Sequence, residues 1–225
     1  MQSLVVNGSP RERTHTAMIK ALEKGLTEAG SKVTKISLKS LNISPCLGCY
    51  TCWRATPGKC VQEDDMESIL HLVAQSDLLF LVTPVYVDGM TAQMKTFMDR
   101  LIPLLEGIVE TRDGYIRHPL REGVKRGKIA LMSACGFPEL DTFDPLVAHV
   151  KALCKNFDRE YAGEVLVPSG GHLMMRGDWD AVLKIVEYAG ACLVKDGKIP
   201  SNLSLKIHSL VSSDELVNAL NAIYG

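Results

Sequence analysis

The chain has 225 residues, with 25 Lys and Arg against 26 Asp and Glu, a formal net charge of −1 and 46% hydrophobic residues. This length suits one domain with a sizeable core, and the balanced charge gives no reason to expect nucleic acid or an anionic membrane as a partner. The longest unbroken apolar run, Leu78–Val82, is far too short to span a membrane.

Cysteine usage and the opening residues indicate the compartment. The sequence begins MQSLVVNGSP, which lacks the basic segment and long apolar run of a secretory signal. Seven cysteines in a chain without such a signal are typical of a reducing environment. We therefore expect a cytoplasmic protein whose thiols serve metal or redox chemistry.

The first half of the chain alternates between short apolar strands and amphipathic helices. Ser3–Asn7 is a predicted buried strand, and Lys32–Ser37 alternates as a second strand. Gly30 ends the helix between them, whose apolar positions are Met18, Ile19, Leu22, Leu26 and Ala29. Asp64 or Asp65 can cap the next helix, whose apolar positions are Met66, Ile69, Leu70 and Val73.

The second half continues the alternation. A continuously apolar third strand begins in Asp77–Val87, and a helix over about Thr91–Leu101 stops at Pro103. Gly127–Ala134 and Tyr161–Pro168 are the fourth and fifth predicted strands, separated by a helix that buries Phe143, Leu146, Val147, Val150 and Leu153. Asp178 caps a final helix that buries Trp179, Val182, Ile185, Val186 and Ala189.

Five apolar strands alternating with helices predict an α/β fold with a parallel sheet covered on both faces. A three-layer doubly wound arrangement fits, either dinucleotide-binding or flavodoxin-like, and the flavodoxin-like fold has the strand order 2-1-3-4-5. We assign residues 1–199 to this domain and 200–225 to a C-terminal extension, which ends in a helix begun by Ser212 or Ser213 with Glu215 in its first turn. The insert 106–126 also departs from the alternation, and both segments suit either oligomer contacts or surface decoration.

The loop after the first strand, NGSPRERTHTA, is rich in hydroxyl groups and cations. The N–H groups that open the following helix converge on the same place, which favours an anion. No G-x-G-x-x-G or G-x-x-x-x-G-K-[ST] pattern is present, so a phosphate monoester suits the loop better than a pyrophosphate or triphosphate. An ordinary capped helix behind a polar turn is the structural alternative.

Two further loops meet this one at the switch point of the predicted sheet, where ligands bind in such folds. TPVYVDGMTAQMKTFMDR follows the third strand and places Tyr86 and a turn there. SACGFPELDTF follows the fourth strand, and Gly136 allows close backbone approach. One loop suited to a phosphate and two suited to a flat ring together favour FMN.

These stretches resemble the flavodoxin-like NADPH-dependent FMN reductases, through GSPR with HT, TPVYVDGMTAQMKTFMDR and CGFPE. The nearest branch is the iron–sulfur flavoproteins and their cluster-free relatives, and the likeness runs from about Met1 to Pro168. It implies noncovalently bound FMN, reduced by NAD(P)H, that passes electrons to an acceptor. The implied phosphate ligands are Ser9, Arg11, Thr14, His15 and Thr16, and the implied ring contacts are Pro84, Val85, Tyr86, Val87, Asp88, Gly89, Ala134, Cys135, Gly136 and Phe137.

The family often has asparagine where this chain has His15, which makes a phosphate contact there sensitive to pH. The flavin carries the chemistry, so we assign no catalytic acid or base. The family likeness also implies a homodimer or homotetramer, in which the insert and the tail have room at the interface.

Four cysteines, Cys46, Cys49, Cys52 and Cys60, follow the pattern C-x2-C-x2-C-x7-C. Three cysteines at this spacing can hold one iron–sulfur cluster with a fourth ligand from further along the chain. The resemblance adds that iron–sulfur flavoproteins carry a [4Fe–4S] cluster on such a motif. Zinc, a redox-active dithiol and free thiols remain alternatives, because cluster-free relatives keep similar cysteines.

These observations predict an FMN-dependent oxidoreductase that moves electrons from NAD(P)H to a quinone, a flavin or a protein acceptor. The sequence does not choose between NADH and NADPH. One alternative is a flavodoxin-type electron carrier without its own substrate. Another is a redox sensor on the same fold that works through its thiols or a bound metal.

Overall fold

The computed structural model describes residues 1–11, 13–211, 216, 217 and 221, without the side chains of Arg13 and Thr14. Five parallel strands form one sheet in the order β2-β1-β3-β6-β7. Their bounds are β1 Gln2–Asn7, β2 Lys32–Ser37, β3 Leu78–Val82, β6 Lys128–Ala134 and β7 Glu160–Val167. This order confirms the predicted flavodoxin-like α/β arrangement.

Side chains alternate across the sheet and build a separate core on each face. In β1, Leu4 and Val6 pack into one core, while Val5 packs into the other. Val5 lies in register with Phe80 of β3, which is also fully buried. The central strands are therefore covered on both sides, as their continuous apolar character predicts.

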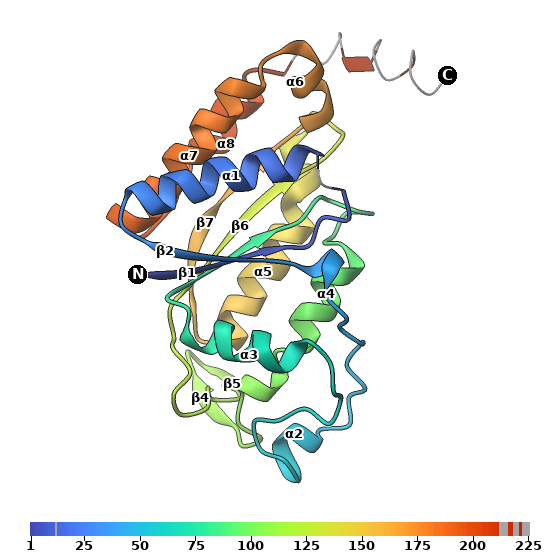
Figure 1. The fold of residues 1–225 in the computed structure, drawn as a ribbon, viewed down its shortest axis with the longest axis vertical. Coiled ribbons are helices and arrows are strands. Elements are labelled where there is room, and N and C mark those ends of the chain that lie inside the picture. Colours follow the sequence, from blue (N-terminus) through green and yellow to red (C-terminus); the bar gives the residue numbers. More distant parts are fainter. Residues whose placement is uncertain (12, 212–215, 218–220, 222–225) are drawn as a thin grey trace.

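Helices cover the two faces in separate layers (Figure 1). One core contains side chains of α3, α4 and α5, and the other contains those of α1, α6, α7 and α8. The bounds are α1 Arg13–Glu28, α2 Thr51–Arg54, α3 Met66–Gln75, α4 Ala92–Asp99, α5 Asp144–Asn156, α6 Gly170–Arg176, α7 Trp179–Lys195 and α8 Leu203–His208. Short 3-10 turns occupy η1 Leu38–Ser40, η2 Ile102–Leu104 and η3 Leu140–Phe143. Among the described helices, none is long and apolar enough to cross a bilayer.

Two glycines allow α1 and α7 to pack at very close range. A Cβ atom on Gly25 would lie 1.9 Å from the carbonyl oxygen of Glu187, and one on Gly190 would lie 2.7 Å from that of Leu22. Neither position has room for a larger residue. This contact holds α1 firmly against its layer and so fixes its first turn at the carboxyl end of β1.

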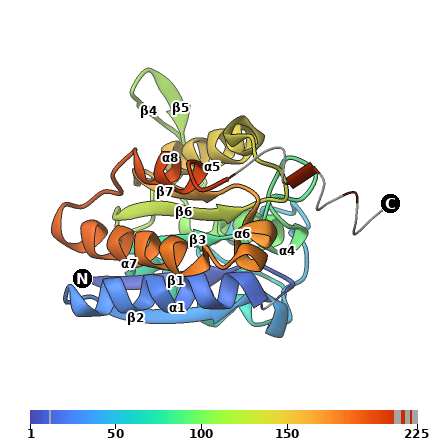
Figure 2. The same cartoon turned by 90° about the horizontal axis from the view of Figure 1, so that it is seen from above.

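The insert folds into a two-stranded hairpin that the sequence analysis missed, with β4 at Glu110–Arg112 and β5 at Tyr115–Arg117. Figure 2 shows this hairpin standing away from the sheet beside α5. Asp113 and Gly114 form its turn with φ of 51° and 78°, so both residues are left-handed, as in a type I′ turn. The Asp-Gly pair is a strong hairpin signal that was present in the sequence.

The predicted helix capping needs correction. Asp178 precedes α7 but makes no capping hydrogen bond, and its carboxylate pairs with Arg176 Nε at 3.3 Å. At α3 the oxygen of Asp64, and not that of Asp65, accepts the N–H of Met66 at 3.0 Å.

Helix α4 ends at Asp99, before the predicted Leu101, and Pro103 lies inside η2. At the other end of the chain, α8 packs Leu203 and Ile207 into the core beside β7. The predicted helix start at Ser212, Ser213 and Glu215 lies outside the described residues.

Candidate functional site

The loop after β1 is organised around the hydroxyl of Ser9, which is buried. This hydroxyl donates to the carbonyl of Arg11 at 2.7 Å and lies 3.2 Å from Nδ1 of His15. Because a carbonyl only accepts and Ser9 has one proton to give, Nδ1 of His15 carries the proton in that contact. The arrangement folds the loop back over the first turn of α1.

His15 lies in that first turn and is 6% exposed. Burial lowers its pKa to about 4, so the ring is neutral at pH 7. Its Nε2 atom is buried without a hydrogen-bond partner among the described residues. A buried nitrogen of this kind costs free energy until a ligand or water satisfies it.

The other predicted phosphate ligands are sequence neighbours of His15. Arg11 is exposed and Thr16 is half-buried. The side chain of Thr14 lies outside the described part of the structure. The first N–H groups of α1 have no acceptor within the helix and carry the positive end of its dipole, so the environment suits an anion.

The loop after β3 begins with buried residues and ends in an exposed tight turn. Tyr86 and Gly89 exchange backbone hydrogen bonds of 2.9 and 3.1 Å around Val87 and Asp88. Val87 has φ of 46° and Asp88 has φ of 62°, and the Val87 side chain is 98% exposed. A β-branched residue is strained in this conformation, and such strain gathers at functional sites.

Hydrogen bonds tie the β1 and β3 loops together. Gly8 N–H donates to Val82 O at 2.8 Å, and the Thr91 hydroxyl donates to Gly8 O at 2.7 Å. The Thr83 hydroxyl accepts the N–H of Thr91 at 3.1 Å. A Cβ on Gly8 would approach Met94 to 2.9 Å, so glycine is required at this crossing.

The loop after β6 is hydrogen-bonded to the loop after β3. Val85 N–H donates to Ala134 O at 3.0 Å, which links Pro84 and its neighbours to the end of β6. Cys135 is buried, and burial raises the pKa of its thiol. A Cβ on Gly136 would meet nothing within 4 Å, and the ring of Phe137 is 62% exposed.

The junction between β7 and α6 holds this loop through backbone hydrogen bonds, a role that the sequence analysis missed. Ser169 N–H donates to Phe137 O at 2.9 Å, and Gly170 N–H donates to Cys135 O at 3.1 Å. Ser169 has φ of 50°, so its backbone is also held in a left-handed conformation. The run SGGH after the fifth predicted strand is the sequence pattern from which this junction could have been predicted.

Buried polar atoms without partners gather at this end of the molecule. Among the described residues they are atoms of Ser133, Ser169, His172 and Trp179 as well as His15, with Arg100 Nε as the exception elsewhere. Ser133 is the penultimate residue of β6, Ser169 precedes α6, His172 lies within α6, and Trp179 opens α7. The helix terminus, the open space at Gly136 and the exposed Tyr86 and Phe137 rings together fit a phosphate-bearing planar cofactor. Nε2 of the neutral His15 is an acceptor, so the ring must gain a proton before it can donate to a phosphate.

The cysteine segment lies apart from these loops, on the side of α4 and the insert. Trp53 of α2 donates its indole N–H to Ile102 O at 3.1 Å, and its ring contacts that of His118 at a tilt of 37°, with centroids 4.3 Å apart. Arg121 donates to Cys52 O at 3.1 Å. The segment is therefore anchored to η2 and to the insert.

A buried ion pair connects the two ends of this segment, at Ser44 and Asp64. Arg100 donates to both oxygens of Asp64 at 2.7 and 3.0 Å, and to Ser44 O at 2.7 Å. The side chains of Arg100 and Asp64 are 1% and 3% exposed. Burial disfavours the charged carboxylate, but the hydrogen bonds from Arg100, Ser44 and Met66 outweigh it and hold the pKa of Asp64 below its usual value.

The four predicted metal ligands differ in environment. Cys46 and Cys49 are exposed, Cys52 is buried and Cys60 is half-buried. The Thr51 hydroxyl donates to Cys49 Sγ at 3.3 Å, which lowers the pKa of that thiol. Burial, followed by the nearby Cys60, raises the pKa of Cys52. Within the described residues, no group of three or more His, Cys, Asp or Glu side chains is gathered for a metal ion.

Comparison of the sequence with known proteins shows which family the chain resembles. Residues 1–136 match the family model described as NADPH-dependent FMN reductase. An iron-sulfur flavoprotein of Archaeoglobus fulgidus is 37% identical over 140 residues, which cover 62% of this chain and 58% of that protein. One from Methanocaldococcus jannaschii is 36% identical over 108 residues, covering 48% of this chain and 55% of that protein. The chain thus spans little more than half the length of these relatives.

Solved structures share the fold at low sequence identity. A putative quinone reductase from Klebsiella pneumoniae has a TM-score of 0.67 at 15% identity, covering 86% of this chain and 85% of that one. An FMN-dependent NADH-azoreductase from Bacillus anthracis, in complex with FMN, has a TM-score of 0.62 at 16% identity, covering 86% and 99%. At these identities the likeness concerns the fold.

Proposed function

The chain belongs to the NADPH-dependent FMN reductase family, and we propose that it is an FMN-dependent oxidoreductase that moves electrons from NAD(P)H to an acceptor. The observation that carries this proposal is that hydrogen bonds join the three loops at the ends of β1, β3 and β6, where the loop after β1 leads into α1. The family membership supplies the nature of the cofactor.

In this proposal the first loop holds the FMN phosphate and the other two hold its ring. The phosphate ligands are Ser9, Arg11, Thr14, His15 and Thr16. The ring contacts are Pro84, Val85, Tyr86, Val87, Asp88, Gly89, Ala134, Cys135, Gly136 and Phe137. Bound FMN supplies acceptance of hydride and delivery of electrons.

The protein's part is to orient the ring and to leave one face open. The turn from Tyr86 to Gly89 is closed by two backbone hydrogen bonds, which present its outer N–H groups in a fixed direction. Fixed donors of this kind stabilise negative charge that develops on a bound ring. The exposed Phe137 side chain is free to contact a cofactor or a substrate.

The phosphate assignment is tested by comparing FMN with riboflavin, which lacks the phosphate. We expect Arg11→Ala to weaken FMN binding about tenfold or more, because a charge-assisted hydrogen bond contributes about 1.5–3 kcal/mol. Riboflavin binding by this variant should stay unchanged. Lys20→Ala, an exposed cation further along α1, is the matched control. Equal loss of FMN and riboflavin binding would contradict the assignment.

Turnover separates an enzyme from a carrier. We propose small-molecule acceptors, a quinone or a flavin, with a protein acceptor as the further possibility that the family allows. Steady-state oxidation of NADH or NADPH with menadione by the FMN-loaded protein supports an enzyme. Bound FMN without such oxidation supports a flavodoxin-type carrier.

For the cysteine segment we propose a [4Fe–4S] cluster on Cys46, Cys49, Cys52 and Cys60. Four thiolates are the right donor set, and the curated relatives are named iron-sulfur flavoproteins. The thiols are not gathered among the described residues, so the segment must close around a cluster to bind it. Iron and acid-labile sulfide in anaerobically purified protein, both lost in Cys46→Ser/Cys49→Ser, would support this.

A redox dithiol is the second candidate for this segment. Cys46 and Cys49 are exposed, and the hydrogen bond from Thr51 favours the thiolate of Cys49. Protein without iron, in which these two cysteines form a reversible disulfide, would support the dithiol. Zinc content without flavin turnover, with a metal-dependent change in sedimentation, would support a sensor.

We propose a cytoplasmic homodimer or homotetramer, as the family likeness implies. Sedimentation of the FMN-loaded protein at micromolar concentration tests the oligomer, and a monomer alone would contradict it.

A further inference from the structure

A cavity lies away from the three loops, between the hairpin, the end of α5 and the start of β7. Its volume is about 630 Å³, which is in the range of small-molecule sites. Arg112, Tyr115 and Arg117 line it from the hairpin, and Lys151 and Lys155 line it from α5. Because Glu160 opens β7, this cavity is at the amino end of that strand, opposite the end that carries the flavin loops.

The hairpin that forms one wall is fixed in place by Arg112. This side chain donates to the carbonyls of Lys155 and Asn156 at 3.0 and 3.3 Å, which are the last carbonyls of α5. It also pairs with Glu110 at 3.0 Å. The cavity wall is therefore attached to the body of the protein and not only to its own turn.

The charges of this cavity do not cancel. Of its carboxylates, Asp158 pairs with Arg112 and Arg126, and Glu160 pairs with Lys128. Among the described residues, Arg117, Lys151 and Lys155 have no carboxylate within ion-pair distance, and the remaining acid is Asp113 at the hairpin turn. Three cations are thus left to face one uncommitted carboxylate.

Arg159 adds a buried cation to the lining. It is 6% exposed, and its guanidinium donates to Val73 O at 2.8 Å and to Ser76 O and Oγ at 3.3 Å. These partners at the end of α3 are neutral, and no described carboxylate forms an ion pair with Arg159. Burial lowers its pKa to about 10. The carbonyls at the C-terminus of α3 carry the negative end of its dipole, and the Asp77 carboxylate raises the Arg159 pKa, so Arg159 stays charged in the cavity lining.

Aromatic rings stand beside these cations. The guanidinium of Arg117 lies 5.1 Å from the centre of the Tyr115 ring, and Lys151 Nζ lies 5.2 Å from that of Tyr161. Tyr115 is 58% exposed, so its ring has surface available for stacking. The Tyr161 hydroxyl is already committed to Glu164 at 2.8 Å.

From this combination we propose that the cavity binds a planar aromatic molecule that carries a phosphate group, of the size of a nucleoside monophosphate. The ring stacks on Tyr115, and the phosphate meets Lys151, Lys155 and Arg117. The site is separate from the FMN site in position and in residues. Its occupant would act on the protein as an effector, because it sits at the opposite end of the sheet from the flavin loops.

The test is calorimetric titration of AMP, adenosine and inorganic phosphate into FMN-saturated protein at low ionic strength. We expect saturable binding of AMP at one site per chain, and much weaker binding of adenosine and of phosphate alone. Lys151→Ala/Lys155→Ala should raise the Kd for AMP at least about tenfold, because each lysine offers a charge-assisted contact. Tyr115→Ala should weaken AMP and adenosine alike, through lost stacking.

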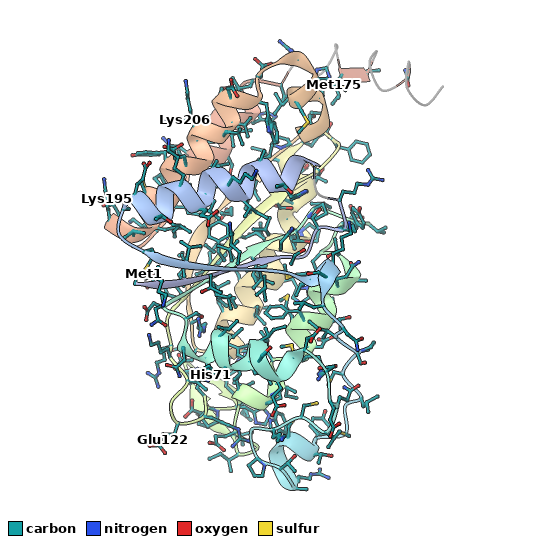
Figure 3. All side chains as sticks on the ribbon, in the orientation of Figure 1. Met1, His71, Glu122, Met175, Lys195 and Lys206 are labelled. Atoms are coloured by element: carbon teal, nitrogen blue, oxygen red, sulfur yellow. The ribbon has the colours of Figure 1, made fainter. Side chains whose placement is uncertain are left out.

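Two controls separate this site from general charge and from the flavin loops. Lys195→Ala/Lys206→Ala removes the same charge from α7 and α8, which cover the opposite face of the sheet from α5, and should leave the Kd unchanged. Figure 3 labels both lysines. Arg11→Ala should also leave AMP binding unchanged. The proposal is wrong if AMP shows no saturable binding, if the Lys151/Lys155 pair and the control pair behave alike, or if Arg11→Ala abolishes the signal. On protein without FMN, AMP can also occupy the flavin loops, and the variants separate the two sites there. A signal lost in Arg11→Ala belongs to the flavin loops, and one lost in Lys151→Ala/Lys155→Ala belongs to this cavity, so failure of the flavin proposal is seen separately.

Discussion

Replacing Asp64 by asparagine removes one partner of the buried pair that closes the cysteine segment. The variant keeps the side-chain shape but leaves the guanidinium of Arg100, 1% exposed, without its counter-charge. Breaking a buried pair in this way costs about 3–5 kcal/mol in the free energy of unfolding. For a domain of this size, about 2–4 °C per kcal/mol predicts a fall in Tm of about 6–20 °C.

Urea denaturation and thermal unfolding measure this cost. Asp99→Asn is the matched control, since its ion pair with Lys95 at 2.6 Å is on the surface of α4 with both side chains 47% exposed. That change should cost less than about 0.5 kcal/mol. Equal losses in the two variants would refute the reasoning that burial makes the Asp64 pair decisive.

The same pair predicts a pH dependence. The folded-state pKa of Asp64 is held below its ordinary value, so its contribution is full above the unfolded pKa of about 3.9. It is lost as the pH falls through the folded-state pKa. Acid unfolding of wild type should therefore show a loss in this range that Asp64→Asn lacks.

Three further predictions concern other features. Val87→Asn should raise the free energy of unfolding by about 1 kcal/mol, because asparagine tolerates the φ of 46°; an unchanged urea midpoint would contradict strain there. His15 has a folded pKa of about 4 against about 6.5 unfolded, so the unfolded chain binds more protons between these values. Stability without FMN should rise with pH across that window by about 3 kcal/mol, and His15→Asn should flatten the rise in urea titrations at successive pH values. Trp53→Phe loses the hydrogen bond to Ile102, at a cost of about 1 kcal/mol; limited proteolysis should then cut the cysteine segment faster, and an unaltered rate would argue against this anchor.

Much of the fold could be predicted from local patterns. The strands around Val5 and Phe80 are continuously apolar because both of their faces are buried, and this signal is independent of distant contacts. Gly30, with φ of 98°, was also predictable as a helix end, because glycine readily adopts the left-handed conformation that follows a helix. The alternation of strands and helices predicted a doubly wound parallel sheet, and the family resemblance selected the flavodoxin-like strand order that the structure has.

What the sequence did not predict depends on contacts between distant segments. Arg100, which follows α4, gave no signal in its own segment, because its partner Asp64 comes from another part of the chain. The capping by Asp178 failed for a local reason: its φ of −78° and ψ of 1° are not the extended backbone of a capping residue, and its carboxylate pairs with Arg176. In the candidate site, the loops were predictable from their composition, whereas the support of Cys135 by Gly170 required the folded β7–α6 junction.

The most direct test of the account is the visible absorption spectrum of anaerobically purified protein, followed by titration with FMN and by iron and sulfide assays. The account predicts structured flavin bands, or their appearance on adding FMN, with one FMN bound per chain. Iron and sulfide in the same sample would add the cluster to the flavin. A colourless protein that binds no FMN would contradict the central claim.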